Sequence, residues 1–233
     1  MKLFISTVTI LVIIILYYAL TVRHKIAISK KIVQATMPFD MITSDKTKSV
    51  LVLGDSTAYG VGANNKDESV PGLFSKKVEA TYVENYAVSG AVVKDLRSQI
   101  AQAKSDKYDY VLVQIGGNDI VAGHDPGQTT EELGQILKTL PAHTKLVVIC
   151  CGSVGDVTII PWVFRSYYAN LTLQYHTEFG KVIPQIGGIY VNLYDEPSVN
   201  PFLKYPEIYL AKDEFHPSTK GYELWFKKIE KIL

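Results

Sequence analysis

The strongest constraint on the fold is a series of five short apolar runs that alternate with segments of helical periodicity. The runs are SVLVLG (49–54), YVENYAV (82–88), YVLVQIG (110–116), KLVVICC (145–151) and GIYVNL (188–193). Such runs suit parallel strands that helices cover on both faces, and the spacers are long enough for crossover helices. We therefore expect an α/β doubly wound sheet of five parallel strands, with ligands bound beyond the carboxyl ends of the strands.

Two of the spacers carry signals for the start of a helix. Ser69 followed by Pro71 predicts a helix in SVPGLFSKKVEATY, and Thr129 with Glu132 predicts a capping box for TTEELGQILKTL. The segment STKGYELWFKKIEKIL is expected to form the closing helix.

The N-terminal segment differs from the rest of the chain. Leu3 to Val22 is a run of 20 residues without a charge, about the length that spans a ~30 Å hydrocarbon core as a helix. A cleaved signal peptide is the alternative, but its apolar region is usually about 7 to 15 residues and ends in an A-x-A-like site, which is not found before Arg23. We therefore predict a single-pass membrane anchor at residues 1–22, a juxtamembrane linker at 23–48 and one globular domain at 49–233.

The side of the membrane on which the domain lies is left open by the flanking charges. Arg23, Lys25, Lys30 and Lys31 follow the span, whereas Lys2 alone precedes it. This positive-inside bias favours a cytoplasmic domain, although long folded domains are exported regardless of such charges.

Net charge, cysteine positions and histidine spacing argue against nucleic-acid binding, a disulfide framework and a metal site. The 24 basic and 23 acidic residues give a net charge of +1, which provides no general field for binding nucleic acid. Cys150 and Cys151 are adjacent at the end of an apolar run, where they are expected to be small core residues and not a disulfide framework. His124, His143 and His176 lack the spacing of a metal site.

Two polar turns follow neighbouring strands of the predicted sheet. The first strand ends in GDSTAYG, which contains Ser56, and the third ends in IGGNDI, which contains Asn118. Each alone is equally consistent with an ordinary turn. In the first of them, Asp55 or Ser56 would then cap a short helix. In a sheet of order 2-1-3-4-5, however, strands one and three are neighbours at the switch point, so Ser56 and Asn118 would lie side by side.

The loop AKDEFHPSTK (211–220) supplies what a serine at this point needs. A serine hydroxyl becomes a good nucleophile when an imidazole takes its proton, and an acceptor on the other ring nitrogen holds that imidazole in the right tautomer. At a separation of three positions in a turn, Asp213 can reach His216 Nδ1 and leave Nε2 facing Ser56. Taken singly, an Asp–His surface turn is the commoner interpretation of this pattern.

Three groups could stabilise the negative charge of a tetrahedral intermediate. They are the backbone N–H groups of Ser56 and Gly90 and the side-chain amide of Asn118. Gly90 follows the second strand in NYAVSGAVVKDL, where we expect it at the start of a helix with its N–H unpaired. A glycine needed for close helix packing is the alternative.

Four ordered blocks resemble those of the SGNH hydrolases, or GDSL-type esterases and lipases, and in particular their bacterial lysophospholipase/arylesterase-like branch. GDSTAYG holds Ser56, NYAVSGA holds Gly90, GGND holds Asn118, and DEFHP holds Asp213 and His216. The resemblance covers about residues 49–233. It implies a flavodoxin-like three-layer fold, ester hydrolysis through an acyl-serine intermediate, and no metal or organic cofactor.

The predicted function is that of a membrane-anchored serine esterase acting on a lysophospholipid, short-chain acyl or acetyl ester. Ser56 is expected to attack, His216 to shuttle the proton and Asp213 to orient His216. The aromatic segments PWVFRSYYANLTLQYHTEF and NPFLKYPEIYL either line an acyl groove or belong to the core. An acyltransferase with the same residues and a non-catalytic binding module are the alternatives.

Overall fold

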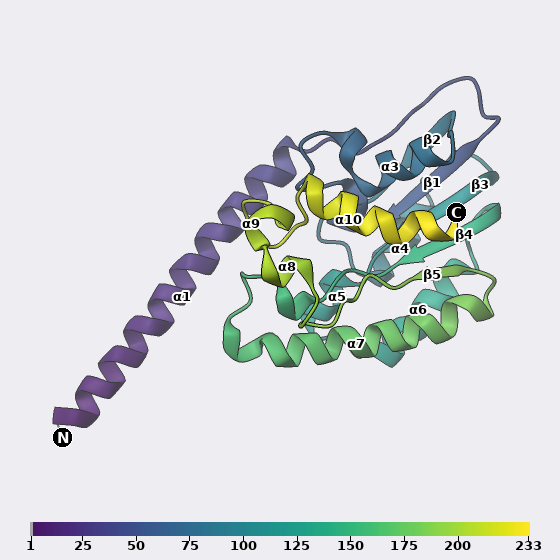
Figure 1. Cartoon of the computed structure of the whole chain (residues 1–233). Coiled ribbons are helices and arrows are strands. Elements are labelled where there is room, and N and C mark those ends of the chain that lie inside the picture. The colour runs from purple at the N-terminus through teal and green to yellow at the C-terminus, as the bar shows by residue number, and fades with distance from the viewer. Residues whose placement is uncertain (1) are drawn as a thin grey trace.

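A computed structural model describes residues 2–233 and contains one sheet of five parallel strands. The strand order is β2-β1-β3-β4-β5. The strands are β1 (Ser49–Gly54), β2 (Tyr82–Asn85), β3 (Lys107–Gln114), β4 (Ala142–Ile149) and β5 (Ile189–Val191). The expected α/β doubly wound fold is confirmed, and each predicted apolar run contributes one strand (Figure 1).

Ten α-helices are assigned within the described residues. They are α1 (Lys2–Ala35), α2 (Ser56–Tyr59), α3 (Val70–Lys77), α4 (Leu96–Ile100), α5 (Gly117–Ala122), α6 (Pro126–Leu137), α7 (Trp162–Gln185), α8 (Pro201–Lys204), α9 (Pro206–Tyr209) and α10 (Thr219–Ile229).

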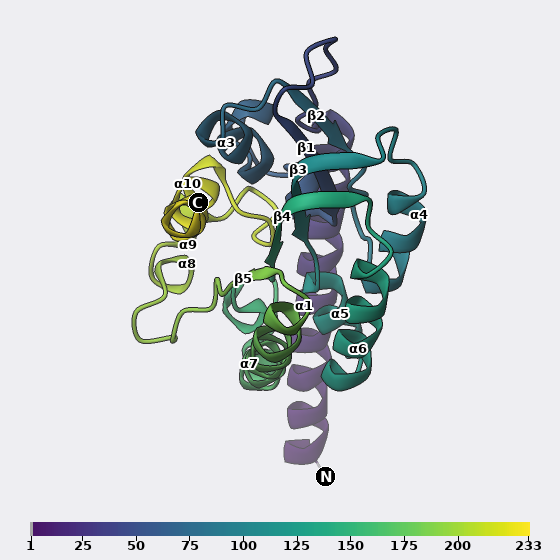
Figure 2. The ribbon, with the colours of Figure 1, turned by 90° about the vertical axis from the view of Figure 1, so that its right-hand side faces the viewer.

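Alternating side chains of the sheet build two cores. Leu51 and Leu53 of β1 pack against α4, α5, α6 and α7, whereas Val50 and Val52 pack against α3 and α10. Figure 2 shows α3 and α10 on one side of the sheet and α4 and α6 on the other. Because both faces are covered, all residues of β1 are buried, which explains its unbroken apolar run.

The predicted helix starts are partly right. Ser69 caps α3 by accepting a hydrogen bond from Gly72 N, as expected. The predicted capping box of Thr129 and Glu132 is wrong, because α6 begins one turn earlier at Pro126. Asp125 caps that helix by accepting from Gln128 N, and proline is favoured in a first helical turn.

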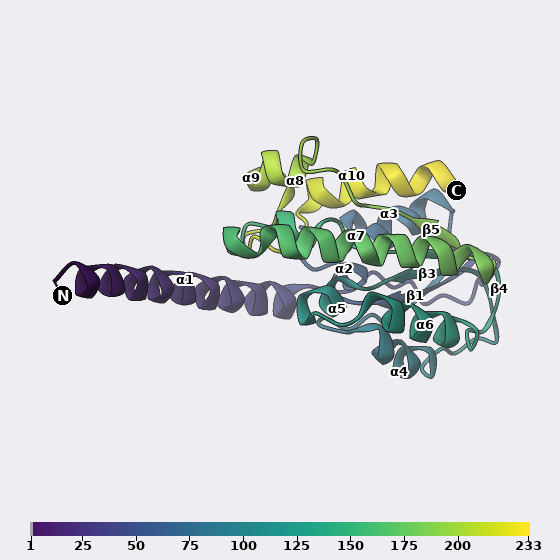
Figure 3. The same ribbon diagram turned by 90° about the horizontal axis from the view of Figure 1, so that it is seen from below.

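Helix α1 projects beyond the domain at its N-terminal end and lies against it at its C-terminal end (Figures 1 and 3). The helix continues without a break from the predicted span through Ala35. Residues 12–20 are all exposed, and among the described residues Val12–Ala35 is the one stretch long and apolar enough to cross a membrane. A signal sequence near the N-terminus can meet the same criteria of length and composition. After α1, Phe39 is buried in the core beside α3, and β1 starts at Ser49.

Candidate active site

Ser56 lies at the first residue of α2, directly beyond the carboxyl end of β1. Asp55 caps this short helix, since its Oδ1 accepts hydrogen bonds from Thr57 N at 2.8 Å and Thr57 Oγ1 at 2.7 Å. Gly54 makes the turn possible. Its φ is +142°, and an added Cβ would lie 1.9 Å from the carbonyl oxygen of Gln114. The tight turn therefore presents Ser56 beyond the carboxyl ends of the strands.

The structure brings Ser56, His216 and Asp213 into one hydrogen-bonded row. His216 Nε2 is 2.9 Å from Ser56 Oγ, and His216 Nδ1 is 2.6 Å from Asp213 Oδ2. All three side chains are buried, with Asp213 fully inaccessible. Asp213 Oδ1 also accepts from the backbone N–H groups of Phe215 and His216, which fixes the loop around the carboxylate.

Two buried carboxyls near Ser56 have shifted pKa values of opposite direction. Burial acts to raise the pKa of Asp213, but hydrogen bonds from His216 and Phe215 outweigh it and hold the pKa below its ordinary value. Asp213 is therefore a carboxylate able to accept from His216 Nδ1–H. Burial raises the pKa of Asp55 to about 6, against the opposing hydrogen bonds from Thr57.

The backbone N–H groups of Ser56 and Gly90 are two candidate hydrogen-bond donors of the site. Gly90 is in a turn with φ +87°, ahead of the 3₁₀ turn Val93–Asp95 rather than at the start of a helix as expected. Within residues 2–233, neither Ser56 N nor Gly90 N has a hydrogen-bond acceptor. An added Cβ on Gly90 would meet no atom within 4 Å, so its surroundings are open. Both N–H groups are thus free to donate to a ligand.

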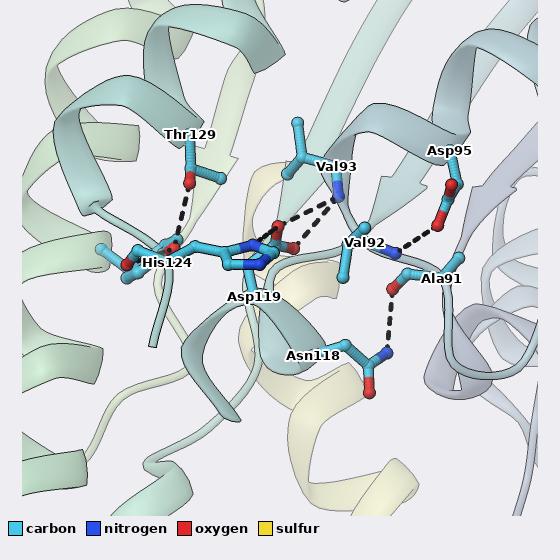
Figure 4. Close-up of polar contacts among 9 residues, drawn as sticks. Ala91, Val92, Val93, Asp95, Asn118, Asp119, His124 and Thr129 are labelled. Carbon is cyan, nitrogen blue, oxygen red and sulfur yellow. Dashed lines mark hydrogen bonds and ion pairs between the residues drawn. The ribbon is translucent and has the colours of Figure 1, made fainter. Parts of the chain in front are cut away.

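Asn118 uses one amide proton within the protein. Its Nδ2 donates to the carbonyl oxygen of Ala91 at 2.9 Å, as Figure 4 shows. A carboxamide nitrogen carries two protons, so the second remains for a ligand. Asn118 borders the same cavities as Ser56 and His216. The contact with Ala91 therefore fixes the direction of the amide relative to the Gly90 turn.

Asp119 makes a second connection between the same two segments (Figure 4). This buried carboxylate accepts from Val93 N at 3.1 and 3.3 Å and lies 3.1 Å from His124 Nδ1. Asn118 and Asp119 thus hold the segment after Gly90 through Ala91 and Val93. Sequence reasoning did not assign Asp119 a part, although it directly follows Asn118.

Two cavities meet at Ser56, and both also border Asn118, Phe215 and His216. The inner cavity has a volume of about 60 Å³ and a mostly apolar wall. Since about 10–15 Å³ is enough for one water, it can hold only a small group. Its apolar lining residues include Val154, Val157, Leu193, Phe202, Leu210 and Trp225.

The outer cavity is wider, at about 720 Å³, and opens to the surface. The aromatic segments noted in the sequence divide between the two cavities. Phe164 and Tyr168 of α7 line the outer one, and Phe202 of α8 lines the inner one. Other aromatic residues of the same segments, such as Tyr175 and Phe179, are buried core residues.

The remaining candidate residues lie as follows. Cys150 is buried and Cys151 half-buried at the end of β4, and both are free thiols, as predicted. His176 is buried, with Nε2 3.0 Å from the carbonyl oxygen of Cys151 and Nδ1 hydrogen-bonded to the Tyr190 hydroxyl. Burial lowers the pKa of His176 to about 4, so it is a neutral part of the core. Among the described residues, no group of three or more His, Cys, Asp or Glu side chains is arranged to hold a metal ion.

Comparisons with known proteins agree with this geometry. The chain is 26% identical over 197 residues to a GDSL-like esterase of Mycobacterium tuberculosis, covering 81% of this chain and 60% of the relative. It is 33% identical over 96 residues to thioesterase 1/protease 1/lysophospholipase L1 of Escherichia coli, covering 40% and 46%. The chain thus spans less than two thirds of the length of either curated relative.

Solved structures support the same fold. A lipolytic protein of the G-D-S-L family from Veillonella parvula has a TM-score of 0.62 and 16% identity, covering 80% of this chain and 98% of that one. The sequence profile of the GDSL-like Lipase/Acylhydrolase family matches residues 52–224, a range that includes Ser56, Gly90, Asn118, Asp213 and His216. The chain therefore belongs to the GDSL-like lipase/acylhydrolase family.

Proposed function

We propose that the protein is a serine esterase that cleaves a carboxylic ester through an acyl-serine intermediate. The observation that carries the proposal is the hydrogen-bonded row of Asp213, His216 and Ser56 at the junction of two cavities. In this mechanism Ser56 Oγ attacks the ester carbonyl while His216 Nε2 takes its proton and then gives it to the leaving alcohol. A water, deprotonated by His216, then releases the acyl group from Ser56.

In this mechanism three hydrogen-bond donors stabilise the negative charge of each tetrahedral intermediate. Among the residues that the structure describes, the N–H groups of Ser56 and Gly90 have no acceptor, and Asn118 uses one of its two amide protons. Preorganised donors of this kind stabilise the transition state more than the substrate, because the charge develops during the reaction. Asp213 keeps the tautomer of His216 in which Nε2 faces the serine.

The proposed location is a membrane surface, with residues 1–22 as a single-pass anchor. The exposed apolar residues at 12–20 and the length of α1 support this assignment. A hydrolase held at a bilayer would meet lipid esters, and the E. coli relative carries the name lysophospholipase. Lysophospholipids are therefore the first substrates to test, followed by short-chain acyl and acetyl esters.

The test is hydrolysis of p-nitrophenyl esters, from acetate to octanoate, by the full chain in detergent beside its Ser56→Ala variant. We expect turnover by the wild type and a loss of about 10⁴-fold or more in the variant. Equal rates for the two proteins would remove Ser56 from the mechanism. An added alcohol acceptor separates hydrolysis from acyl transfer, because a transferase would produce the new ester in place of the free acid.

A further inference from the structure

The C-terminal half of α1 forms one wall of the outer cavity. Six of its residues line the same space as Ser56, Gly90 and His216: Val22, Ile26, Ser29, Lys30, Val33 and Gln34. The opposite wall comes from the loop at 159–161 and from Phe164 of α7. The helix that carries the predicted membrane span therefore borders the cavity into which Ser56 opens.

The six residues lie on one face of α1. Positions 22, 26, 29–30 and 33–34 recur every three or four residues, which is the pattern of a single helical stripe. Ala27 and Lys31, which lie between them, are exposed and do not line the cavity. Val22, Ile26 and Val33 supply an apolar path on this stripe, which runs on into the exposed apolar residues at 12–20.

An ion pair holds this wall against the catalytic loop. Lys25 Nζ is 2.6 Å from Glu214 Oε1 and also contacts the carbonyl oxygen of Lys212 at 3.4 Å. The other carboxylate oxygen of Glu214 accepts from Thr158 Oγ1 at 3.0 Å, and the Glu214 carbonyl accepts from Ile159 N. Glu214 thus connects α1, the loop with His216 and the opposite wall of the cavity.

The shape of the site suggests what the outer cavity binds. Its volume of about 720 Å³ is in the range of sites for whole small molecules, whereas the inner cavity holds only a small group. Because Ser56 borders both, a carbonyl at Ser56 would leave a long hydrocarbon chain only the outer cavity to occupy. That chain would lie along the apolar stripe of α1, which leads back toward the predicted span.

We propose that the stripe of α1 that lines the outer cavity is part of the substrate site and binds the hydrocarbon chain of an ester drawn from a lipid layer. This inference rests on the proposed esterase function, since it names the substrate class of the same site. It makes α1 a specificity element as well as an anchor. Short esters do not reach the stripe, so their hydrolysis does not depend on it.

The experiment compares two small-to-tryptophan variants of the full chain in detergent micelles. Ser29→Trp fills the cavity from the stripe, and Ala27→Trp adds the same side chain on the exposed face of the same turn. Both are assayed on p-nitrophenyl acetate and p-nitrophenyl dodecanoate. We expect Ser29→Trp to lower kcat/KM for dodecanoate about 10-fold or more and to leave acetate within about twofold, because a blocked apolar subsite costs this much. Ala27→Trp should leave both within about twofold.

The outcomes separate this inference from the proposed function. Wild-type rates on dodecanoate in Ser29→Trp would overturn the role of α1 while the esterase function stands. No turnover of either ester by the wild type would overturn the esterase function and this inference with it. If Ser29→Trp loses both activities, Ile26→Ser decides, since it removes apolar contact without adding bulk. A selective loss on dodecanoate then supports the inference, and unchanged selectivity refutes it.

Discussion

Lys25 of α1 and Glu214 of the loop that holds Asp213 and His216 form an ion pair of 2.6 Å, although 189 residues separate them in the chain. Glu214 has a φ of +59°, a conformation that non-glycine residues adopt rarely. It lies between Asp213 and His216, whose positions decide, in the proposed mechanism, whether Ser56 can be activated. The pair therefore joins the position of the N-terminal helix to the geometry of the hydrogen-bonded row of Asp213, His216 and Ser56.

Loss of this ion pair should change activity more than stability. The side chains of Lys25 and Glu214 are 19% and 41% exposed, and ion pairs near the surface contribute about 0–1 kcal/mol. We predict that Lys25→Met leaves the Tm nearly unchanged but lowers kcat/KM about 3-fold to 10-fold, because a small displacement of a catalytic loop slows the reaction. Lys25→Arg should restore the rate. Lys31→Met, which removes an exposed lysine of the same helix, is the control. Equal rates for Lys25→Met and Lys31→Met would contradict the coupling.

Asn118 should act on the transition state and not on substrate binding. Removing one oxyanion donor typically lowers kcat by about 10²- to 10³-fold. We predict a loss of that size in Asn118→Ala, with KM nearly unchanged, measured by steady-state hydrolysis of a p-nitrophenyl ester. A kcat close to that of the wild type would show that the amide does not contact the developing charge.

Asp119 should act by positioning the segment after Gly90. In Asp119→Ala the buried Val93 N–H loses its acceptor, which costs roughly 1–3 kcal/mol of folding free energy. The freed turn should also lower kcat, with a smaller change in KM. Asp119→Asn keeps an oxygen acceptor and should recover much of both losses. Urea unfolding and steady-state kinetics measure the two effects, and a loss of stability without any loss of kcat would reject the positioning role.

The buried carboxyl of Asp55 predicts a pH dependence of stability. Burial raises its pKa from 3.8 to about 6, so the folded protein holds this proton more tightly than the unfolded chain does. Ionisation in this window therefore destabilises the fold, and the free energy of unfolding falls as the pH rises from about 4 to 6. Asp55→Asn can still accept from Thr57 but has no proton to lose.

The comparison of wild type with Asp55→Asn isolates this contribution. Between about pH 4 and pH 7 the wild type should lose on the order of 3 kcal/mol relative to the variant. Urea unfolding at a series of pH values gives both curves. Parallel curves for the two proteins would mean that Asp55 titrates alike in the folded and unfolded states.

The sheet and the hydrogen-bonded row of Asp213, His216 and Ser56 could be predicted from the sequence because their signals are local. Each strand contains part of a mainly apolar run, and the parallel order brings the turns after β1 and β3 together. The Asp213–His216 contact spans only three residues, so a single turn sets it. The start of α6 was missed because Asp125 and Pro126 outcompete Thr129 as the capping signal.

The wall formed by α1 was not predictable in this way. Lys25 and Glu214 carry no sequence signal of their own, since charged residues of both signs are common on exposed surfaces. Their pairing depends on how the tertiary fold directs α1 past the carboxyl ends of the strands. The sequence likewise does not show that one amide proton of Asn118 is left for a ligand, because this depends on the contact of the other proton with Ala91.

The most direct test of the account is the site of covalent labelling by an alkyl phosphonate ester that reacts with activated serines. The full chain is treated with the reagent, digested and analysed by mass spectrometry, beside the His216→Ala variant. The account predicts one phosphonate adduct on Ser56 in the wild type and a greatly reduced yield in His216→Ala, because the hydroxyl then lacks its base. An unlabelled Ser56, or equal labelling of both proteins, would contradict the central claim that His216 activates Ser56.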